Sequence, residues 1–318
     1  MNKNWLILII IFIFLGCKKE DKLEAEIAGI TVGVHVERFD RLFSESKPDD
    51  LPELKKSYPF MFSKNFTDED YLARLTDSLQ VELHNEVNAS FDEFPEEDDI
   101  KSLFRHLKYY YKGFQEPRLI TVTSDVDYRN KVIVTDTIVL IALDTYLGKD
   151  HEYYGNIQNY LKQNFERNMI VSDLAEAYAR KNIVKRETRT FLEDMIFYGK
   201  ILYFKDRMIP FANDEIKMGY SKDQLNWARA NESNIWRYFV ENEIMFDTDP
   251  KLAARFINPA PFSKFNLELD RDSPGRLGQY IGWEIVRAYM INNKVDLHQL
   301  LTKDADDIFK NARFKPRK

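Results

Sequence analysis

The chain has 318 residues, of which 44% are hydrophobic and 14% aromatic. A mature region of about 300 residues with this composition can bury a large core, which excludes intrinsic disorder. The formal net charge is −6 and the basic residues are dispersed, which argues against a nucleic-acid-binding surface and a polybasic membrane-binding surface. A single cysteine excludes an intramolecular disulfide and a cysteine-based zinc site.

The N-terminal residues predict export from the cytoplasm. Lys3 precedes an uninterrupted apolar run over residues 5–15. This run is shorter than the roughly 20 residues that cross a bilayer as a helix, and it matches the apolar region of about 7–15 residues in a secretory signal. We therefore expect residues 1–16 to be a signal peptide.

Cys17 directly follows the signal peptide in Phe14-Leu15-Gly16-Cys17, which resembles the lipobox of bacterial lipoproteins, with Phe14 where leucine is usual. The resemblance implies that Cys17 is lipidated and anchors the chain in a membrane, with residues 17–28 as a tether. Each buried methylene contributes about 0.8 kcal/mol, so several acyl chains hold firmly. The alternative is an ordinary buried thiol.

The charged residues after Cys17, Lys18-Lys19-Glu20-Asp21, resemble the signal that sends some lipoproteins to the outer leaflet of the outer membrane. Any solvated tether would also be charged. The sequence therefore leaves the membrane leaflet open.

Residues 29–318 predict one globular domain of the α+β class, mostly helical with a small β-sheet. Residues 30–37 alternate as in a strand. Thr67 and Asp70 form a capping box that begins a helix expected to end before Pro95, and a second amphipathic helix covers about residues 100–111.

The middle of the chain predicts three short strands at residues 119–123, 132–135 and 138–143, which together form a small sheet. Asp144 follows the third strand, where a carboxylate often caps the next turn. Capping is the preferred interpretation and a functional carboxylate is the alternative. From about Val171 the pattern is almost entirely helical.

The segment of residues 189–204 is apolar on most of its circumference, yet it contains Asp194 and Lys200. Charges on a buried helix are expected to be paired or to line a cavity. Gly199 indicates close approach of another backbone, because glycine is unfavourable inside a helix. We therefore place a candidate pocket here.

The last informative stretch predicts a helix that begins with Ser273 as N-cap and Pro274 at the first position. Its glycines Gly275, Gly278 and Gly282 lie on one face and allow another helix to pack at backbone distance. Arg276 joins Asp144, Asp194 and Lys200 as a candidate pocket or partner-binding residue.

Several motifs together resemble the family of gliding motility lipoproteins called GldB. They are the lipobox, Glu37-Arg38-Phe39-Asp40, the run from Asp194 to Tyr203, Ala260-Pro261-Phe262-Ser263-Lys264-Phe265 and the helix from Ser273 to Met290. The resemblance covers nearly the whole chain. It implies a cell-envelope lipoprotein that is required for gliding and is tied to the type IX secretion machinery.

The order of elements also resembles a zincin metallopeptidase. A zincin needs two histidines four residues apart on a helix and a glutamate beside the first, so that Zn²⁺ is bound and water is activated. No two of the five histidines are four apart, and residues 195–200 stand where we expect the motif. The sequence thus predicts, at most, a degenerate zincin-like fold without the metal site.

Three interpretations compete. We favour a non-catalytic structural or assembly component of an envelope motility apparatus, with no catalytic, cofactor or metal residues, anchored by lipid on Cys17 and bound to other envelope proteins. The alternatives are a lipid-anchored hydrolase with an unrecognised site, and a lipoprotein that binds a peptide or glycan in an aromatic pocket.

Overall fold

The structure is a computed structural model that describes residues 22–183, 189–266 and 268–318. The expected signal peptide and the expected lipidation residue Cys17 lie outside these ranges. Within the expected tether, residues 22–28 are helical, and Ile27 is only 1% exposed. Among the described helices, none has both the length and the apolar character that crossing a bilayer requires.

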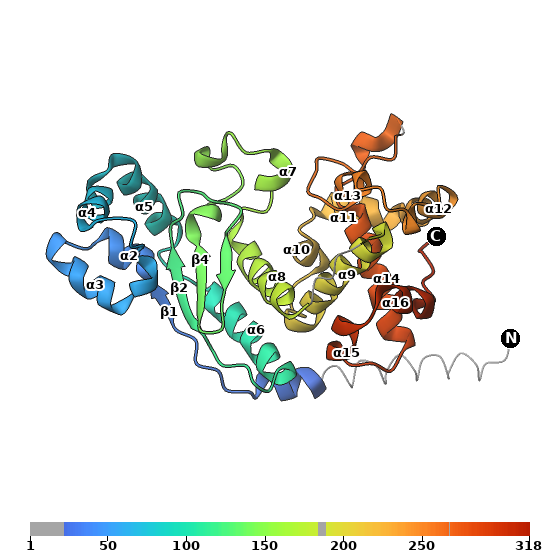
Figure 1. The fold of residues 1–318 in the computed structure, drawn as a ribbon, viewed down its shortest axis with the longest axis horizontal. Coiled ribbons are helices and arrows are strands. Elements are labelled where there is room, and N and C mark those ends of the chain that lie inside the picture. The colour runs from blue at the N-terminus through green and yellow to red at the C-terminus, as the bar shows by residue number, and fades with distance from the viewer. Residues whose placement is uncertain (1–21, 184–188, 267) are drawn as a thin grey trace.

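A four-stranded mixed sheet lies between two groups of helices (Figure 1). The strands have the spatial order β1-β2-β4-β3 and are β1 (Val36–Arg38), β2 (Arg118–Val122), β3 (Val132–Val134) and β4 (Ile138–Ala142). β1, β2 and β4 are parallel, whereas β3 is an antiparallel edge strand paired with β4. The three strands predicted in the middle of the chain are confirmed, but the strand predicted over residues 30–37 is reduced to β1.

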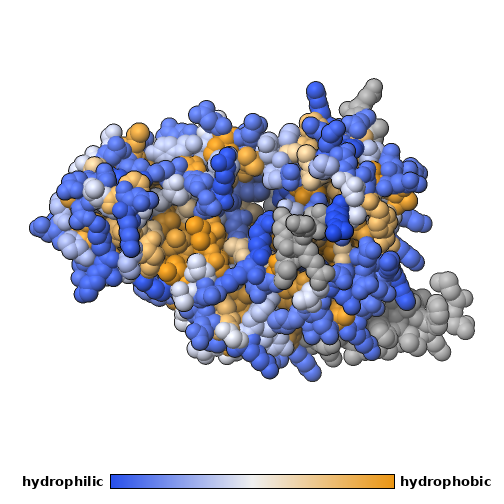
Figure 2. Space-filling model, viewed as in Figure 1, coloured by the Kyte–Doolittle hydropathy of each residue, from blue (hydrophilic) through white to orange (hydrophobic). Residues whose placement is uncertain are grey.

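Side chains alternate between the two faces of the sheet, as the period of two requires. Leu119, Val139 and Ile141 face the main core, and Ile120 and Val122 face a smaller cluster with Phe39 and Tyr58. On the face of the sheet that packs against Phe39 and Tyr58, the half near β3 is partly open to solvent, and the side chain of Ile133 is 44% exposed. Apolar side chains accordingly gather over the strands in the space-filling view (Figure 2).

Helices from the N-terminal part of the chain pack around the sheet. They are α2 (Phe39–Ser44), α3 (Leu51–Ser57), α4 (Asp68–Thr76), α5 (Ser78–Ser90) and α6 (Glu96–Tyr110). The predicted capping box is confirmed, because Thr67 accepts from the backbone N–H of Asp70 while the Asp70 carboxylate accepts from that of Thr67. The long helix predicted after it is wrong. Asp77 interrupts it and caps α5 by accepting from the N–H groups of Leu79 and Gln80.

The C-terminal half is helical, as predicted. Its helices are α7 (Asn159–Lys162), α8 (Ile170–Asn182), α9 (Phe191–Met208), α10 (Asp214–Met218), α11 (Lys222–Ala230), α12 (Glu232–Glu241), α13 (Lys251–Phe256), α14 (Leu277–Asn292), α15 (Leu297–Thr302) and α16 (Ala305–Ala312). α8 lies between the sheet and this helical body and contacts both β3 and α9. The mostly helical α+β class is therefore confirmed.

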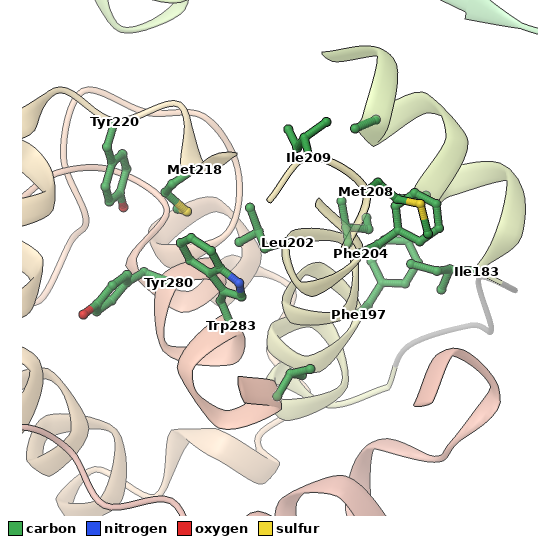
Figure 3. Close-up of a cluster of buried hydrophobic side chains, with 14 of the residues drawn as sticks. Ile183, Phe197, Leu202, Phe204, Met208, Ile209, Met218, Tyr220, Tyr280 and Trp283 are labelled. Atoms are coloured by element: carbon green, nitrogen blue, oxygen red, sulfur yellow. The ribbon is translucent and has the colours of Figure 1, made fainter. Parts of the chain in front are cut away.

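α9 and α14 cross at their glycines. A Cβ atom added to Gly199 would lie 2.3 Å from the carbonyl oxygen of Gly282, and one added to Gly282 would lie 1.9 Å from that of Met195. Only glycine lets two backbones approach this closely, so the predicted backbone contact is confirmed. Figure 3 shows Leu202 of α9 beside Trp283 of α14 in the surrounding core.

The predicted start of the last long helix is wrong. α14 begins at Leu277 and not at Pro274, because Arg276 adopts a left-handed conformation with φ of 61°. The Ser273 hydroxyl donates to the carbonyl oxygen of Asp270 and does not cap α14. Gly275 lies before the helix and lets the chain pass close to Ala260.

Candidate functional site

A group of charged side chains lies where α8 meets α9 and the end of α10. We call it the α8–α9 charged site and define it as Ser172, Asp173 and Glu176 of α8 with Lys205 of α9. Lys205 is 3% exposed, and its ammonium group contacts three oxygen atoms. They are Ser172 Oγ at 3.2 Å, Glu176 Oε2 at 2.9 Å and the Lys217 carbonyl oxygen at 3.1 Å. An ammonium group has three donors, so every donor of Lys205 has an acceptor.

Glu176 is held from two sides. Besides Lys205, it accepts two hydrogen bonds from Arg180, at 2.8 and 3.1 Å. Burial alone would raise its pKa, but the nearby charges of Lys205 and Arg180 hold the pKa of Glu176 well below its usual value. Glu176 is therefore a carboxylate, a state suited to pairing with cations and unsuited to donating a proton.

Asp173 is also neutralised within the fold. The ammonium group of Lys131 pairs with it, and the Tyr146 hydroxyl donates to it at 2.9 Å. Burial, followed by the charge of Asp173, raises the pKa of Tyr146 well above its usual value, so Tyr146 stays a neutral donor. Because Lys131 precedes β3, this pair also ties α8 to the edge of the sheet.

Further ion pairs continue from Lys217 across the helical body. Lys217 pairs with Asp206 of α9 at 3.1 Å. Arg287 of α14 bonds both Asp206 and Asp214 at 2.8 Å and stacks on Trp283. Burial alone would lower the pKa of Arg287, but these two carboxylates raise it, so Arg287 stays charged. The charges thus link α9, α10 and α14.

The predicted residue Asp144 lies apart from this site, at the end of β4. It is fully buried, and its carboxylate accepts from the backbone N–H groups of Ser124 at 2.9 Å and Val126 at 2.7 Å. Burial outweighs these bonds and raises the pKa of Asp144. The contacts are those of a capping carboxylate that holds the loop after β2, where Asp125 and Val126 have positive φ.

The predicted residue Lys200 lines a cavity of about 560 Å³ between α9 and the α15–α16 segment. Its ammonium group donates to the backbone carbonyl oxygens of Leu301, at 3.2 Å, and Lys303, at 2.5 Å. These carbonyls belong to the C-terminal end of α15, where a positive charge is favoured by the helix dipole. Lys200 therefore stabilises the end of α15 at the edge of the cavity.

The predicted residue Arg276 lines a different cavity, of about 120 Å³, together with Glu176 and Arg180. It donates to the carbonyl oxygen of Gly219 at 2.8 Å and stacks on Tyr220. Asp194 is half-buried in the first turn of α9, where the helix dipole favours a carboxylate. The structure thus brings Arg276 near the α8–α9 charged site, and it places Lys200 and Asp144 elsewhere.

Sequence reasoning missed the α8–α9 charged site. Residues 195–200 were expected at the position of a zincin motif, but Met195, Ile196 and Gly199 pack in the core, with Gly199 against α14. The zincin motif places a histidine, a glutamate and a second histidine at positions i, i+1 and i+4 of a helix. The same spacing in α8 is occupied by Ser172, Asp173 and Glu176. That spacing of polar residues on one helix was the signal that could have identified the site.

The donor set of this site does not suit a divalent metal ion. Ser172 offers a hydroxyl and Glu176 a carboxylate, and the ammonium group of Lys205 already bonds both of them. A fixed positive charge at this point repels a second cation. Over residues 22–183, 189–266 and 268–318, no three His, Cys, Asp or Glu side chains are grouped so as to hold a metal ion.

Comparison with known proteins gives one result. The model of the family described as gliding motility protein GldB matches residues 20–316, which is nearly the whole chain. No curated protein matches. No solved structure matches either. The family is one of gliding motility lipoproteins associated with the cell envelope. The matched range includes both groups of helices and the sheet between them, and the chain therefore belongs to the GldB family of gliding motility proteins.

Proposed function

We propose that this protein is a non-catalytic structural or assembly component of the gliding apparatus, linked to the type IX secretion machinery. Lipid on Cys17 anchors it in the outer membrane, and its folded domain contacts other envelope proteins. Membership of the GldB family supports the role in gliding and the envelope location. The link to secretion rests on the resemblance described from the sequence.

The observation that supports the non-catalytic role is that each N–H donor of the Lys205 ammonium group already has an acceptor within the fold. A catalytic lysine needs a free amine or a proton to transfer, whereas all three donors of Lys205 are bound. The carboxylates next to it are paired with Arg180 and Lys131. Such a network stabilises the junction of α8 and α9 without requiring a substrate.

We also propose that the scaffold is a degenerate zincin. The mixed sheet with its antiparallel edge strand β3, and the i, i+1, i+4 polar spacing on the adjacent helix α8, support this relationship. A serine and a glutamate at the two histidine positions, with the ammonium group of Lys205 bonded to both, would give such a scaffold no zinc ligand set.

Metal analysis of the purified mature protein tests this proposal. We expect less than stoichiometric zinc, because a lysine ammonium group occupies the centre of the site. Stoichiometric zinc that is lost together with a substrate-cleaving activity on chelation would overturn the non-catalytic role. A Cys17→Ser variant tests the anchor separately, since it should leave the membrane fraction while keeping its fold.

A specific cavity favours a second candidate function, that of a ligand-binding lipoprotein. The cavity has a volume of about 710 Å³ and is lined by Tyr110, Tyr111, Phe114 and Tyr178. Aromatic walls suit a peptide or glycan. Calorimetric titration with peptidoglycan fragments tests this candidate, and heat that disappears in a Phe114→Ala variant would support it.

A further inference from the structure

The helix over residues 22–28 is fixed to the end of α6. Ile27 is 1% exposed, and the Glu24 carboxylate lies 3.1 Å from Nε2 of His106. Two further bonds hold the chain that follows, from Arg105 to the Ile30 carbonyl and from Lys108 to the Thr31 carbonyl, both at 3.2 Å. The domain surface therefore begins at Lys22.

The length of chain between the anchor and this helix is short. If Cys17 carries the lipid, as the proposed function states, five Cα–Cα steps join it to Lys22. At about 3.6 Å per residue, these steps span at most about 18 Å. A domain of about 300 residues is on the order of 50 Å across. The end of the molecule next to Lys22 must therefore stay close to the lipid surface.

This end carries aromatic and basic side chains of the kind found at membrane surfaces, together with Glu24 and Glu26 of the helix over residues 22–28. The C-terminal turn of α6 carries Tyr109 and Tyr110, which are both half-buried, and Lys112 follows them in an exposed position. The His298 ring bonds the carbonyl oxygen of Tyr110 at 2.7 Å and is itself exposed. Tyrosines prefer the interface between lipid and water, and lysines bind anionic headgroups.

We propose that the α6 end, defined as residues 22–28 with Tyr109, Tyr110, Lys112 and His298, is the surface that faces the lipid bilayer. Figure 1 shows the dark-blue segment of residues 22–28 beside the lower end of α6, whereas α7 lies at the opposite end of the molecule. The orientation directs α7 away from the membrane. It also leaves the α7 end accessible to proteins at a distance from the bilayer.

Fluorescence quenching by spin-labelled lipid tests this orientation. Because Cys17 is the only cysteine and its sulfur would carry the lipid, a single added thiol can be labelled alone. The full lipidated chain is reconstituted in vesicles of phosphatidylethanolamine and phosphatidylglycerol, with a label at Lys112→Cys or at Asn159→Cys in α7. Both positions are exposed, so neither substitution should disturb the fold.

We expect quenching at position 112 to be several-fold stronger than at position 159. Equal quenching at both positions, or stronger quenching at 159, would overturn the proposal. Inserting about 20 Gly/Ser residues between Asp21 and Lys22 should reduce the quenching at 112 several-fold, since such a linker lets the domain rotate. Unchanged quenching in this variant would contradict the role of tether length.

The intact mass is measured first on the same samples. A missing acyl mass would contradict the proposed anchor itself, whereas an acylated protein with the wrong quenching pattern contradicts only the orientation.

Discussion

Lys205 lies in a closely restricted environment. Its ammonium group is almost completely buried and bonds one hydroxyl and one carboxylate of α8 and one backbone carbonyl at the end of α10. A buried cation is stable only when its partners are fixed in this way. Lys205 therefore acts as a structural link between α8, α9 and the end of α10.

Replacing Lys205 by methionine should lower the free energy of unfolding by about 2–4 kcal/mol. Methionine keeps the volume of the side chain but removes the positive charge that pairs with Glu176. Arg180, which also pairs with Glu176, offsets part of this loss. Chemical denaturation measures the loss. Lys222→Met is the matched control, because Lys222 is exposed and should change stability by less than about 0.5 kcal/mol. Equal stabilities of the two variants would contradict the structural role of Lys205.

His84 should make stability depend on pH. It is 7% exposed, and burial lowers its pKa, although the nearby Asp40 opposes this shift. The pKa of a histidine in the unfolded chain is about 6.5. As pH falls through this value, the unfolded chain takes up the proton before the folded protein does, so the free energy of unfolding decreases. We expect a His84→Gln variant to lose part of this decrease.

Urea denaturation between about pH 7.5 and 5.5 measures the difference. The control is His35→Gln, since the side chain of His35 is exposed. A His84→Gln variant with the pH dependence of the wild type would show that His84 is not the titrating group.

At the scale of elements, the crossing of α9 and α14 organises the helical body. The sequence predicted a close backbone contact at Gly199 and at the glycines of the last long helix, but not that the two contacts are the same one. The capping box at Thr67 was equally easy to identify, since its side chain and its backbone partner are only three residues apart. Local signals of this kind can be identified without knowledge of the fold.

Gly282→Ala should destabilise the protein by about 3 kcal/mol or more. Its Cβ would lie 1.9 Å from the Met195 carbonyl oxygen, so the two helices would have to separate. Thermal unfolding monitored by circular dichroism measures the effect. Gly33→Ala is the matched control, because no atom lies within 4 Å of the added Cβ. If both variants unfold at the wild-type temperature, the close crossing is wrong.

Other elements could not be predicted because their signals are not local. Arg276 in a left-handed conformation shifts the start of α14, although Ser273 and Pro274 form a typical helix start. The parallel pairing of β2 with β4 skips β3, which no alternation pattern reveals. The polar spacing on α8 is visible in the sequence, but the position of Lys205 of α9 against it is not.

At the scale of the whole molecule, the short chain after Cys17 and the paired charges in the centre point to one role. If Cys17 carries the proposed lipid, the helix over residues 22–28 leaves little free tether and holds the domain close to the bilayer. The ion pairs of the α8–α9 charged site neutralise groups that could otherwise act in catalysis. On the proposed function, the protein would then be a fixed support for other envelope proteins.

The central claim, that the protein is a non-catalytic support, is tested most directly by gliding of a deletion strain. The strain expresses a variant with the substitutions Ser172→Ala, Asp173→Asn and Glu176→Gln. The variant removes the groups of α8 that could serve as nucleophile, acid or base, and circular dichroism and membrane fractionation establish that it is folded and anchored. The account predicts that colonies spread as with the wild-type protein. A folded, anchored variant that fails to restore gliding would contradict it.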